Sequence, residues 1–246
     1  HGRDRRQRQM CIRDRLHTVK ENLTHLLFPR ICFVCENELE SSKEVFCTLC
    51  YSRLPFAYIQ DTAEDHPIQN LFGGRLDLQH SYSLLYYEKK GEAQKLLHAL
   101  KYQNKPQLGV HLGRWLGKEI QKQGWSQEID VLLPVPLHPK KEFTRGYNQS
   151  LKLAEGLSHI LELPIDQTII KRNKNSKSQT KQVGRFKRWD NIQSAFGVVK
   201  RKMEYKHVAI VDDVITTGVT MERICSELKE NYPEIRISII SLAFAK

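Results

Sequence analysis

The chain has 246 residues, with 39 basic and 28 acidic side chains and a formal net charge of +11, and 40% of its residues are hydrophobic. This length allows one sizeable core with a small appendage, and the positive charge favours phosphate-rich partners, either nucleotides or nucleic acid. No apolar run approaches the roughly 20 residues of a membrane span and no signal-peptide pattern appears, so the cytoplasm is the expected location.

Residues 1–15, HGRDRRQRQMCIRDR, are expected to be a non-native leader. They do not begin with Met, show no helical or strand period, and resemble translated sequencing-adapter read-through. We therefore set them aside, together with Cys11, as one would a tag. The remaining chain has 33 basic and 26 acidic residues, a net charge of +7.

Residues 16–53 are predicted to form a short amphipathic helix followed by a zinc hairpin. Cys32 and Cys35 form one CxxC pair, Cys47 and Cys50 form a second, and eleven residues separate the pairs. Two such pairs can close a tetrahedral Cys₄ site that has no open position, so we expect structural zinc that supplies most of the hairpin's folding energy. Disulfides or redox motifs are the alternative, which the missing secretion signal disfavours.

Residues 54–78 are predicted to be a linker or hood, because Pro and Gly interrupt them. From 79 to 246, strands alternate with helices, which predicts an α/β fold with a parallel sheet. The expected strands are 81–88, 130–133, 195–199, 206–211 and 235–245, and the expected helices include 106–124 and 148–161.

Two further details concern packing. Gly109, Gly113 and Gly117 fall on one side of the helix at 106–124, which predicts close contact with a neighbouring backbone. Cys225 lies on the apolar face of a helix that contains Met221 and Leu228, so we expect a core residue and not a nucleophile.

The stretch from 208 to 220, VAIVDDVITTGVT, is the best clue to chemistry. Four apolar residues predict a buried strand, and Asp212 and Asp213 are then expected at its carboxyl end, where open α/β sheets bind ligands. A turn follows and opens a helix, and its backbone N–H groups and hydroxyls suit a phosphate; it comprises Thr216, Thr217, Gly218, Val219 and Thr220. The two carboxylates and the turn together indicate a site for a phosphorylated sugar. The alternative is a strand-to-helix corner with an Asx turn.

This stretch resembles the phosphoribosyl pyrophosphate (PRPP) signature of type I phosphoribosyltransferases. Within that fold the chain resembles the ComF family, which is associated with competence. The further marks are PVPLHP from 134, RGYNQ from 145, Gln179-Thr180 with Arg188 and Asn191, and the cysteine cluster. The family often has Phe where this chain has Tyr147. The resemblance covers about residues 26 to 246.

The resemblance places the pyrophosphate loop at Pro134, Val135 and Pro136. Arg145 could clamp phosphate oxygens in a bidentate manner, and Asn148 and Gln149 offer further donors at a helix start. The alternative is that RGYNQ only caps the helix, with Asn148 as its N-cap.

Residues 171–188 contain eight Lys or Arg and no acid. Such a run can be a solvated face, but the resemblance implies a loop that closes over PRPP at this place in the topology. A basic loop with Phe186 and Trp189 would also suit a single-stranded nucleic acid.

The sequence is thus interpreted as a ComF-type protein that binds PRPP with magnesium and transfers phosphoribosyl to an unknown acceptor, releasing pyrophosphate. Asp212 and Asp213 would be the catalytic pair and hold the ribose hydroxyls. The alternative is a non-catalytic competence protein that binds single-stranded DNA or competence-machinery proteins and uses the fold as a PRPP-sensing or structural platform.

Overall fold

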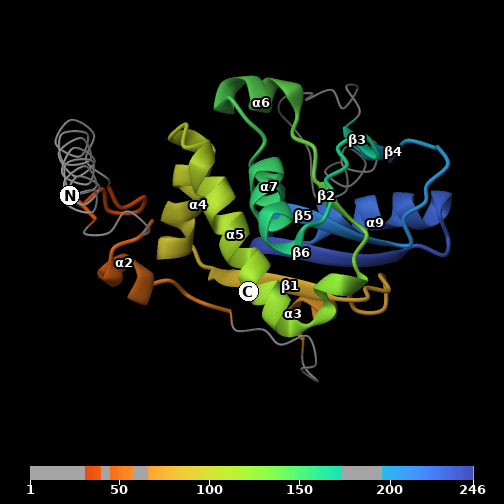
Figure 1. The fold of residues 1–246 in the computed structure, drawn as a ribbon, viewed down its shortest axis with the longest axis horizontal. Helices are drawn as coiled ribbons and strands as arrows, with labels where there is room; N and C mark the ends of the chain where they lie inside the picture. The colour runs from red at the N-terminus through yellow and green to blue at the C-terminus, as the bar shows by residue number, and fades with distance from the viewer. Residues whose placement is uncertain (1–30, 40–44, 58–65, 173–195, 246) are drawn as a thin grey trace, which may run out of the picture. The chain divides into compact units, whose positions relative to one another are not determined.

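The computed structural model describes residues 31–39, 45–57, 66–172 and 196–245 (Figure 1). The chain divides into two compact units, one that ends at Arg53 and one that begins at Leu54. The predicted leader, the helix expected in residues 16–28, part of the predicted linker and the basic run beyond Arg172 lie outside the described residues. In the ranges described, no helix combines the length and the apolarity needed to cross a bilayer.

The first unit contains two tight turns, one at each cysteine pair. Around the first pair, Ile31 and Glu38 form an antiparallel bridge, and the N–H of Cys32 donates to the carbonyl of Asn37 at 2.7 Å. The second pair is at the start of α2 (Thr48–Ser52), where Cys47 is the N-cap and Cys50 lies in the first turn of the helix. Each pair is thus held in a compact backbone turn, as a metal knuckle requires.

The second unit is built on a four-stranded sheet in the order β1-β6-β5-β2. Its strands are β1 (Ser81–Tyr87), β2 (Val131–Pro134), β5 (His207–Ile215) and β6 (Arg236–Ala245). All three neighbouring pairs are parallel. The predicted parallel sheet is therefore confirmed, and its central strands are buried on both faces as their continuous apolar runs require.

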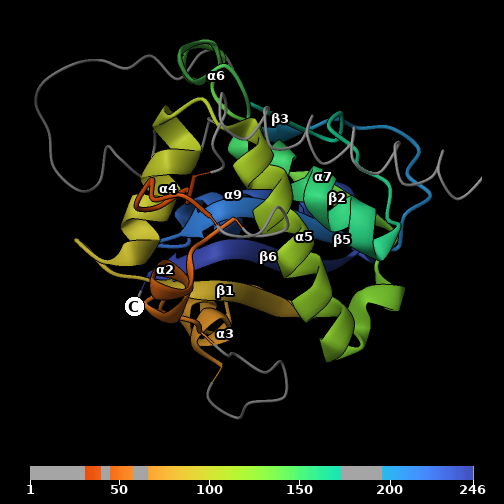
Figure 2. The same cartoon turned by 60° about the vertical axis from the view of Figure 1, so that its left-hand side comes forward.

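Helices cover both faces of this sheet (Figures 1 and 2). On one face lie α4 (Glu92–Tyr102), α5 (Pro106–Gln123) and α7 (Gln149–Leu161), which contact one another and the strands. On the other face, α3 (Pro67–Phe72) and α9 (Val219–Asn231) share one apolar core with alternate strand residues. Cys225 belongs to that core, as predicted, and burial raises its pKa to about 12.

The glycines of α5 lie against α7. A Cβ at Gly113 would lie 2.1 Å from the carbonyl oxygen of Leu153, and a Cβ at Gly156 would lie 2.2 Å from that of Val110. No side chain fits at such distances, so the predicted close backbone contact is confirmed. This contact holds α7 beside the sheet, and α7 carries part of the site described below.

The structure differs from the sequence-based expectation in several elements. Strand β5 continues through Asp212 and Asp213 to Ile215, so the acids lie within the strand and not after it. The region predicted as a linker contains α3, whose Ile68 and Phe72 are buried. Residues 196–198 do form a strand, but β4 (Phe196–Val198) pairs antiparallel with β3 (Ile170–Arg172) outside the main sheet.

Two short helices were also not predicted, α6 (Pro139–Arg145) and the 3₁₀ helix η1 (Trp125–Glu128). Elements of three to seven residues are too short to show a hydrophobic period, so sequence pattern gives them little signal.

Candidate functional site

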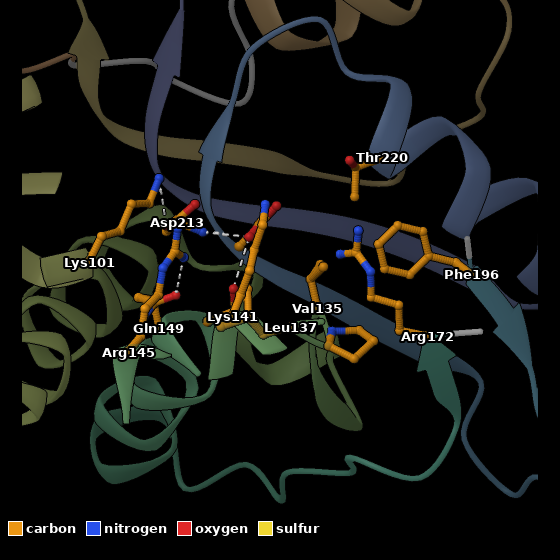
Figure 3. Close-up of a pocket in the computed structure, with 13 residues that line it drawn as sticks. Lys101, Val135, Leu137, Lys141, Arg145, Gln149, Arg172, Phe196, Asp213 and Thr220 are labelled. Carbon is orange, nitrogen blue, oxygen red and sulfur yellow. Dashed lines mark hydrogen bonds and ion pairs between the residues drawn. The ribbon is translucent and has the colours of Figure 1, made fainter. Parts of the chain in front are cut away.

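A pocket of about 180 Å³ opens where β2 and β5 end (Figure 3). Two carboxylates and four cationic side chains share its wall. The residues that line it are Lys101, Val135, Pro136, Leu137, Lys141, Arg145, Gln149, Ser150, Arg172, Phe196, Asp212, Asp213 and Thr220. They come from helices on both faces of the sheet, from the β3–β4 hairpin and from the strand ends, so the fold concentrates opposite charges in one small space.

The two acids have different partners. Asp212 accepts a hydrogen bond from the hydroxyl of Ser150 at 2.9 Å and another from the N–H of Asp213 at 2.8 Å. The Asp213 carboxylate forms an ion pair with the Lys101 ammonium at 2.9 Å. One acid is thus held from α7 and the other from the end of α4, two helices on the same face of the sheet.

Burial and the adjacent charge of Asp213 raise the pKa of Asp212 to about 7, although hydrogen bonds from Asp213 and Ser150 and the charge of Lys101 oppose the rise. A carboxyl with this pKa changes its charge within the physiological range. Such a group can accept hydrogen bonds from hydroxyls in one state and donate in the other.

The turn before α9 depends on glycine. Gly218 has φ 73°, in the left-handed region, and a Cβ there would lie 2.7 Å from the Phe72 ring. Thr220 follows in the first turn of α9 and lines the pocket, whereas Thr216 and Thr217 are exposed and lie outside its lining. Val219 is the first residue of α9. The predicted turn therefore reaches the pocket through its last residue.

The predicted pyrophosphate loop also reaches the pocket. Val135 and Pro136 line it, and the N–H of Val135 donates to the carbonyl of Val211 at 2.9 Å, which ties the loop to β5. Pro134 ends β2 and lies outside the lining. The loop backbone is thus a fixed wall beside the acids.

Within RGYNQ, the residues divide between the pocket and the helix cap. Arg145 and Gln149 line the pocket, and the guanidinium donates to the Gln149 side-chain oxygen at 2.8 Å. Asn148 is the N-cap of α7, and its amide also donates to the carbonyl of Val135 at 3.0 Å. Tyr147 is buried, and its hydroxyl donates to the carbonyl of Leu100.

Four polar or aromatic pocket residues were not singled out from the sequence, namely Lys101, Ser150, Arg172 and Phe196. Arg172 lies at the start of the basic run, so that charge pattern pointed toward it. Lys101 carries no such signal, because a lysine in the last turn of a helix is common for dipole reasons alone.

Residues 98–246 match the family described as the phosphoribosyl transferase domain. The chain belongs to this family. The match includes every residue that lines the pocket, so the geometry above is that of a phosphoribosyl transferase domain.

Among curated proteins, this phosphoribosyl transferase domain protein is similar to members of the ComF group. It is 33% identical to Competence protein F of Haemophilus influenzae over 140 residues, 55% of this chain and 61% of that protein. It is 32% identical to DNA utilization protein YhgH of Escherichia coli O157:H7 over 139 residues, 55% of this chain and 60% of that protein. Competence protein ComFC of Bacillus subtilis is 31% identical over 91 residues, 37% of this chain and 35% of that protein.

These similarities support the assignment to the ComF family. The matched region spans less than two thirds of the length of each of these relatives.

In the first unit of this ComF-type chain, four sulfurs converge. The Sγ atoms of Cys32, Cys35, Cys47 and Cys50 all lie within 4.8 Å of one another, and those of Cys35 and Cys47 are 3.7 Å apart. Tetrahedral zinc with bonds of about 2.3 Å would hold its sulfurs roughly 3.8 Å apart, so the cluster could bind a structural zinc ion.

The ionisation of these thiols also fits a metal site. Burial opposes ionisation of Cys32, but backbone hydrogen bonds from Cys35, Cys47 and Val34 lower its pKa to about 7. Burial and the neighbouring sulfurs raise the pKa of Cys50. Without a cation, such close sulfurs resist carrying several negative charges, and a divalent metal removes that conflict.

Proposed function

We propose that the chain binds PRPP in this pocket and transfers its phosphoribosyl group to an acceptor, with release of pyrophosphate. The observation that carries the proposal is the acid pair in a pocket whose other charged residues are basic. PRPP has the matching pattern, a diol between two phosphate-bearing ends. Carboxylates accept hydrogen bonds from a diol, while cations and backbone N–H groups favour phosphates.

The acids would hold the ribose. Asp212 and Asp213 would accept hydrogen bonds from the 2′- and 3′-hydroxyls, with Ser150 orienting the Asp212 carboxylate through the bond it already makes. To receive the diol, Asp213 must share or give up its contact with Lys101. The lysine is then free to contact a phosphate, so substrate binding would exchange one ion pair for another.

The phosphates would lie on either side of the acids. The turn from Thr216 to Thr220 would hold the 5′-phosphate at the N-terminus of α9, where backbone N–H groups are free of helix partners. The wall formed by Val135 and Pro136, with Lys141 and Arg145 beside it, would hold the pyrophosphate.

In the transfer, a nucleophile on the acceptor forms a bond to ribose C1 while the C1–O bond to pyrophosphate breaks, and the electron pair leaves with pyrophosphate. Magnesium prefers oxygen ligands and fits a pocket that combines carboxylates with bound phosphates; when present it would neutralise the leaving group. The protein's own part is to orient the ribose and to stabilise the departing charge with its basic side chains.

Calorimetry of full-length protein with PRPP and magnesium tests the proposal. The wild type should bind, and Asp212→Asn with Asp213→Asn should lose at least about 100-fold in affinity, because two charge-assisted hydrogen bonds to the diol are lost. Asp77→Asn, at an exposed acid outside the pocket, should bind normally. Absence of binding by the wild type would refute the proposed function, and unchanged binding by the double variant would refute the role of the acids.

A second function is favoured by the names of the relatives, which refer to competence and DNA utilization. In that case the chain is a non-catalytic platform that binds single-stranded DNA or partners in the competence machinery. Its affinity for oligonucleotides would fall with salt and with Ala at Lys181, Arg185 and Arg188.

A pyrophosphate-release screen separates the two functions. PRPP is presented with bases, amines and oligonucleotides in turn. Turnover with any acceptor establishes a transferase and identifies the acceptor class, whereas salt-dependent oligonucleotide binding without turnover favours the platform.

The first unit would serve as a structural zinc hairpin in either case. We propose that Cys32, Cys35, Cys47 and Cys50 bind one zinc ion, on the evidence of their convergent sulfurs.

A further inference from the structure

Arg172 is a pocket cation whose role the acid pair and the predicted loops do not explain. It ends β3, and its register partner across the hairpin is Phe196 of β4. The guanidinium carbon lies 4.9 Å from the centre of the Phe196 ring, and both residues line the pocket. The neighbouring Lys171 is exposed, as expected for the next residue along a strand.

Phe196 supports the Arg172 guanidinium. This phenylalanine residue is 4% exposed and packs in the same apolar core as Ile215 and Met221, which flank the turn before α9. Strand β4 also contacts α9 directly. The guanidinium is therefore held on a rigid aromatic support at the end of the pocket formed by α9.

Within the described ranges, no counter-charge lies within hydrogen-bond reach of the guanidinium. Among the described residues, Arg172 forms no ion pair, and its Nε is buried without a hydrogen-bond partner. Burial lowers its pKa, and the charge of Asp212 is what opposes that effect. A buried donor without a partner costs free energy that an anionic ligand would recover.

The position of Arg172 indicates which anion it would meet. Figure 3 shows Arg172 and Phe196 on the side of Val135 and Thr220, whereas Lys101, Arg145 and Gln149 lie on the other side, around Asp213. The pocket thus has Arg172 at one end and Lys101 with Arg145 at the other. Thr220 belongs to the turn to which the 5′-phosphate is assigned above.

We propose that Arg172, supported by Phe196, binds the 5′-phosphate of the substrate, so that this end is recognised by a side-chain cation as well as by the turn before α9. The inference rests on the proposed function, since it takes the ligand to be a phosphoribosyl compound. It implies that the two ends of PRPP are bound by separate cations, Arg172 at one and the Lys101–Arg145 side at the other.

Ribose 5-phosphate and pyrophosphate each carry one end of PRPP, so titrating them separately tests the assignment. With full-length protein in calorimetry, Arg172→Gln should bind ribose 5-phosphate about 10- to 100-fold more weakly, because a charge-assisted contact is lost. Its affinity for magnesium pyrophosphate should stay within about twofold of the wild type. Arg145→Gln, on the other side of the pocket, should show the opposite pattern.

Two further variants separate a specific contact from a change of net charge or fold. Lys171→Gln removes the same charge one residue away on an exposed side chain and should leave both affinities unchanged. Arg172→Lys keeps the charge but not the planar fork, and should lose less affinity for ribose 5-phosphate than Arg172→Gln. Thermal melts of each variant verify folding, and a folded Arg172→Lys keeps the test valid if Arg172→Gln unfolds.

The outcomes distinguish a failure of the role proposed for Arg172 from a failure of the proposed function. If wild type and Arg172→Gln bind ribose 5-phosphate equally, or if only pyrophosphate binding suffers, Arg172 does not bind the 5′-phosphate, and the proposed function stands. If the wild type binds neither ligand nor PRPP, the proposed function fails and this inference fails with it.

Discussion

Asp212 is the residue on which the chemistry of the pocket most depends. It bonds to Ser150 from α7, lies beside Asp213, and its pKa of about 7 makes its charge sensitive to small changes nearby. Lys101 acts on this balance, since its positive charge favours the ionised form of Asp212 while it pairs with Asp213. The affinity for a diol should therefore depend on pH.

We expect the affinity for ribose 5-phosphate to rise as pH increases from about 6 to 8, because Asp212 loses its proton and becomes a hydrogen-bond acceptor. Lys101→Met removes a charge that lowers this pKa, so the midpoint of the rise should move to higher pH. Asp212→Asn should retain only the change due to the phosphate itself, whose second pKa is about 6. A midpoint that stays in place in Lys101→Met would contradict the coupling.

The sequence pattern identified the pocket residues that are neighbours in the chain and missed those that are far apart in it. Asp212, Asp213, Gly218 and Thr220 follow one another in the chain, so a single pattern identified them. Lys101 and Arg172 meet the acids only through the fold. Contacts between residues far apart in sequence have no periodic signature, so one sequence without the fold does not indicate them.

Among the elements, the long ones were predicted closely, whereas several short ones, such as α3 and β3, were not. The helix at Pro106–Gln123 was predicted to within one residue because its apolar face repeats over several turns. The six residues of α3 and the three of β3 offer no repeat, yet α3 contributes Phe72 behind Gly218 and β3 contributes Arg172. The short elements thus supply parts of the site that pattern alone cannot find.

The cysteine hairpin is the element whose folding we expect to depend on a ligand. Purified protein should contain one zinc per chain by elemental analysis, and Cys32→Ser with Cys47→Ser should contain none, because two of four ligands are lost. Cys225→Ser, at a buried cysteine of the other unit, should keep its zinc. Protein without zinc in which Cys32 and Cys47 are found in disulfides would disprove the assignment.

At the edge of the sheet opposite the pocket, where the strands begin, a cluster of histidine and tryptophan rings is packed together. There the rings of His80 and Trp125 stack at 4.8 Å, and those of His80 and His207 lie 6.0 Å apart. His207 is fully buried and its Nε2 lies 2.8 Å from the hydroxyl of Ser238. Burial, then the charges of Arg236 and His80, lower the pKa of His207, against the opposing effect of Glu128.

Acid should destabilise the protein through this cluster. Below about pH 6.5 the unfolded chain binds a proton at His207 that the folded chain resists, so the free energy of unfolding should fall as pH drops from about 7 to 5. Urea unfolding across this range should show a smaller fall in His207→Gln than in the wild type. His98→Gln, at an exposed histidine, should behave as the wild type. Equal slopes in His207→Gln and wild type would rule His207 out.

Asp212 acts in the opposite direction, because its raised pKa lets the folded chain hold a proton that the unfolded chain releases above about pH 4. The comparison between variants isolates His207 from this opposing effect.

The fold as a whole was predictable because the alternation of strands and helices specifies a parallel sheet, but the order of its strands was not. Strand β6 is last in the chain, yet it lies between β1 and β5. The position of β6 between β1 and β5 depends on the packing of side chains from many elements, so no local sequence pattern predicts it.

The contact between Gly113 of α5 and Gly156 of α7 has a consequence for how variants of this protein are interpreted. Two backbones meet there, so no rotamer can adjust to a substitution. In a mutational scan, these glycines would be as intolerant as Asp212 or Asp213, although neither lines the pocket. Intolerance at them would report on assembly of the scaffold, and binding measured on the folded fraction would tell the two kinds of position apart.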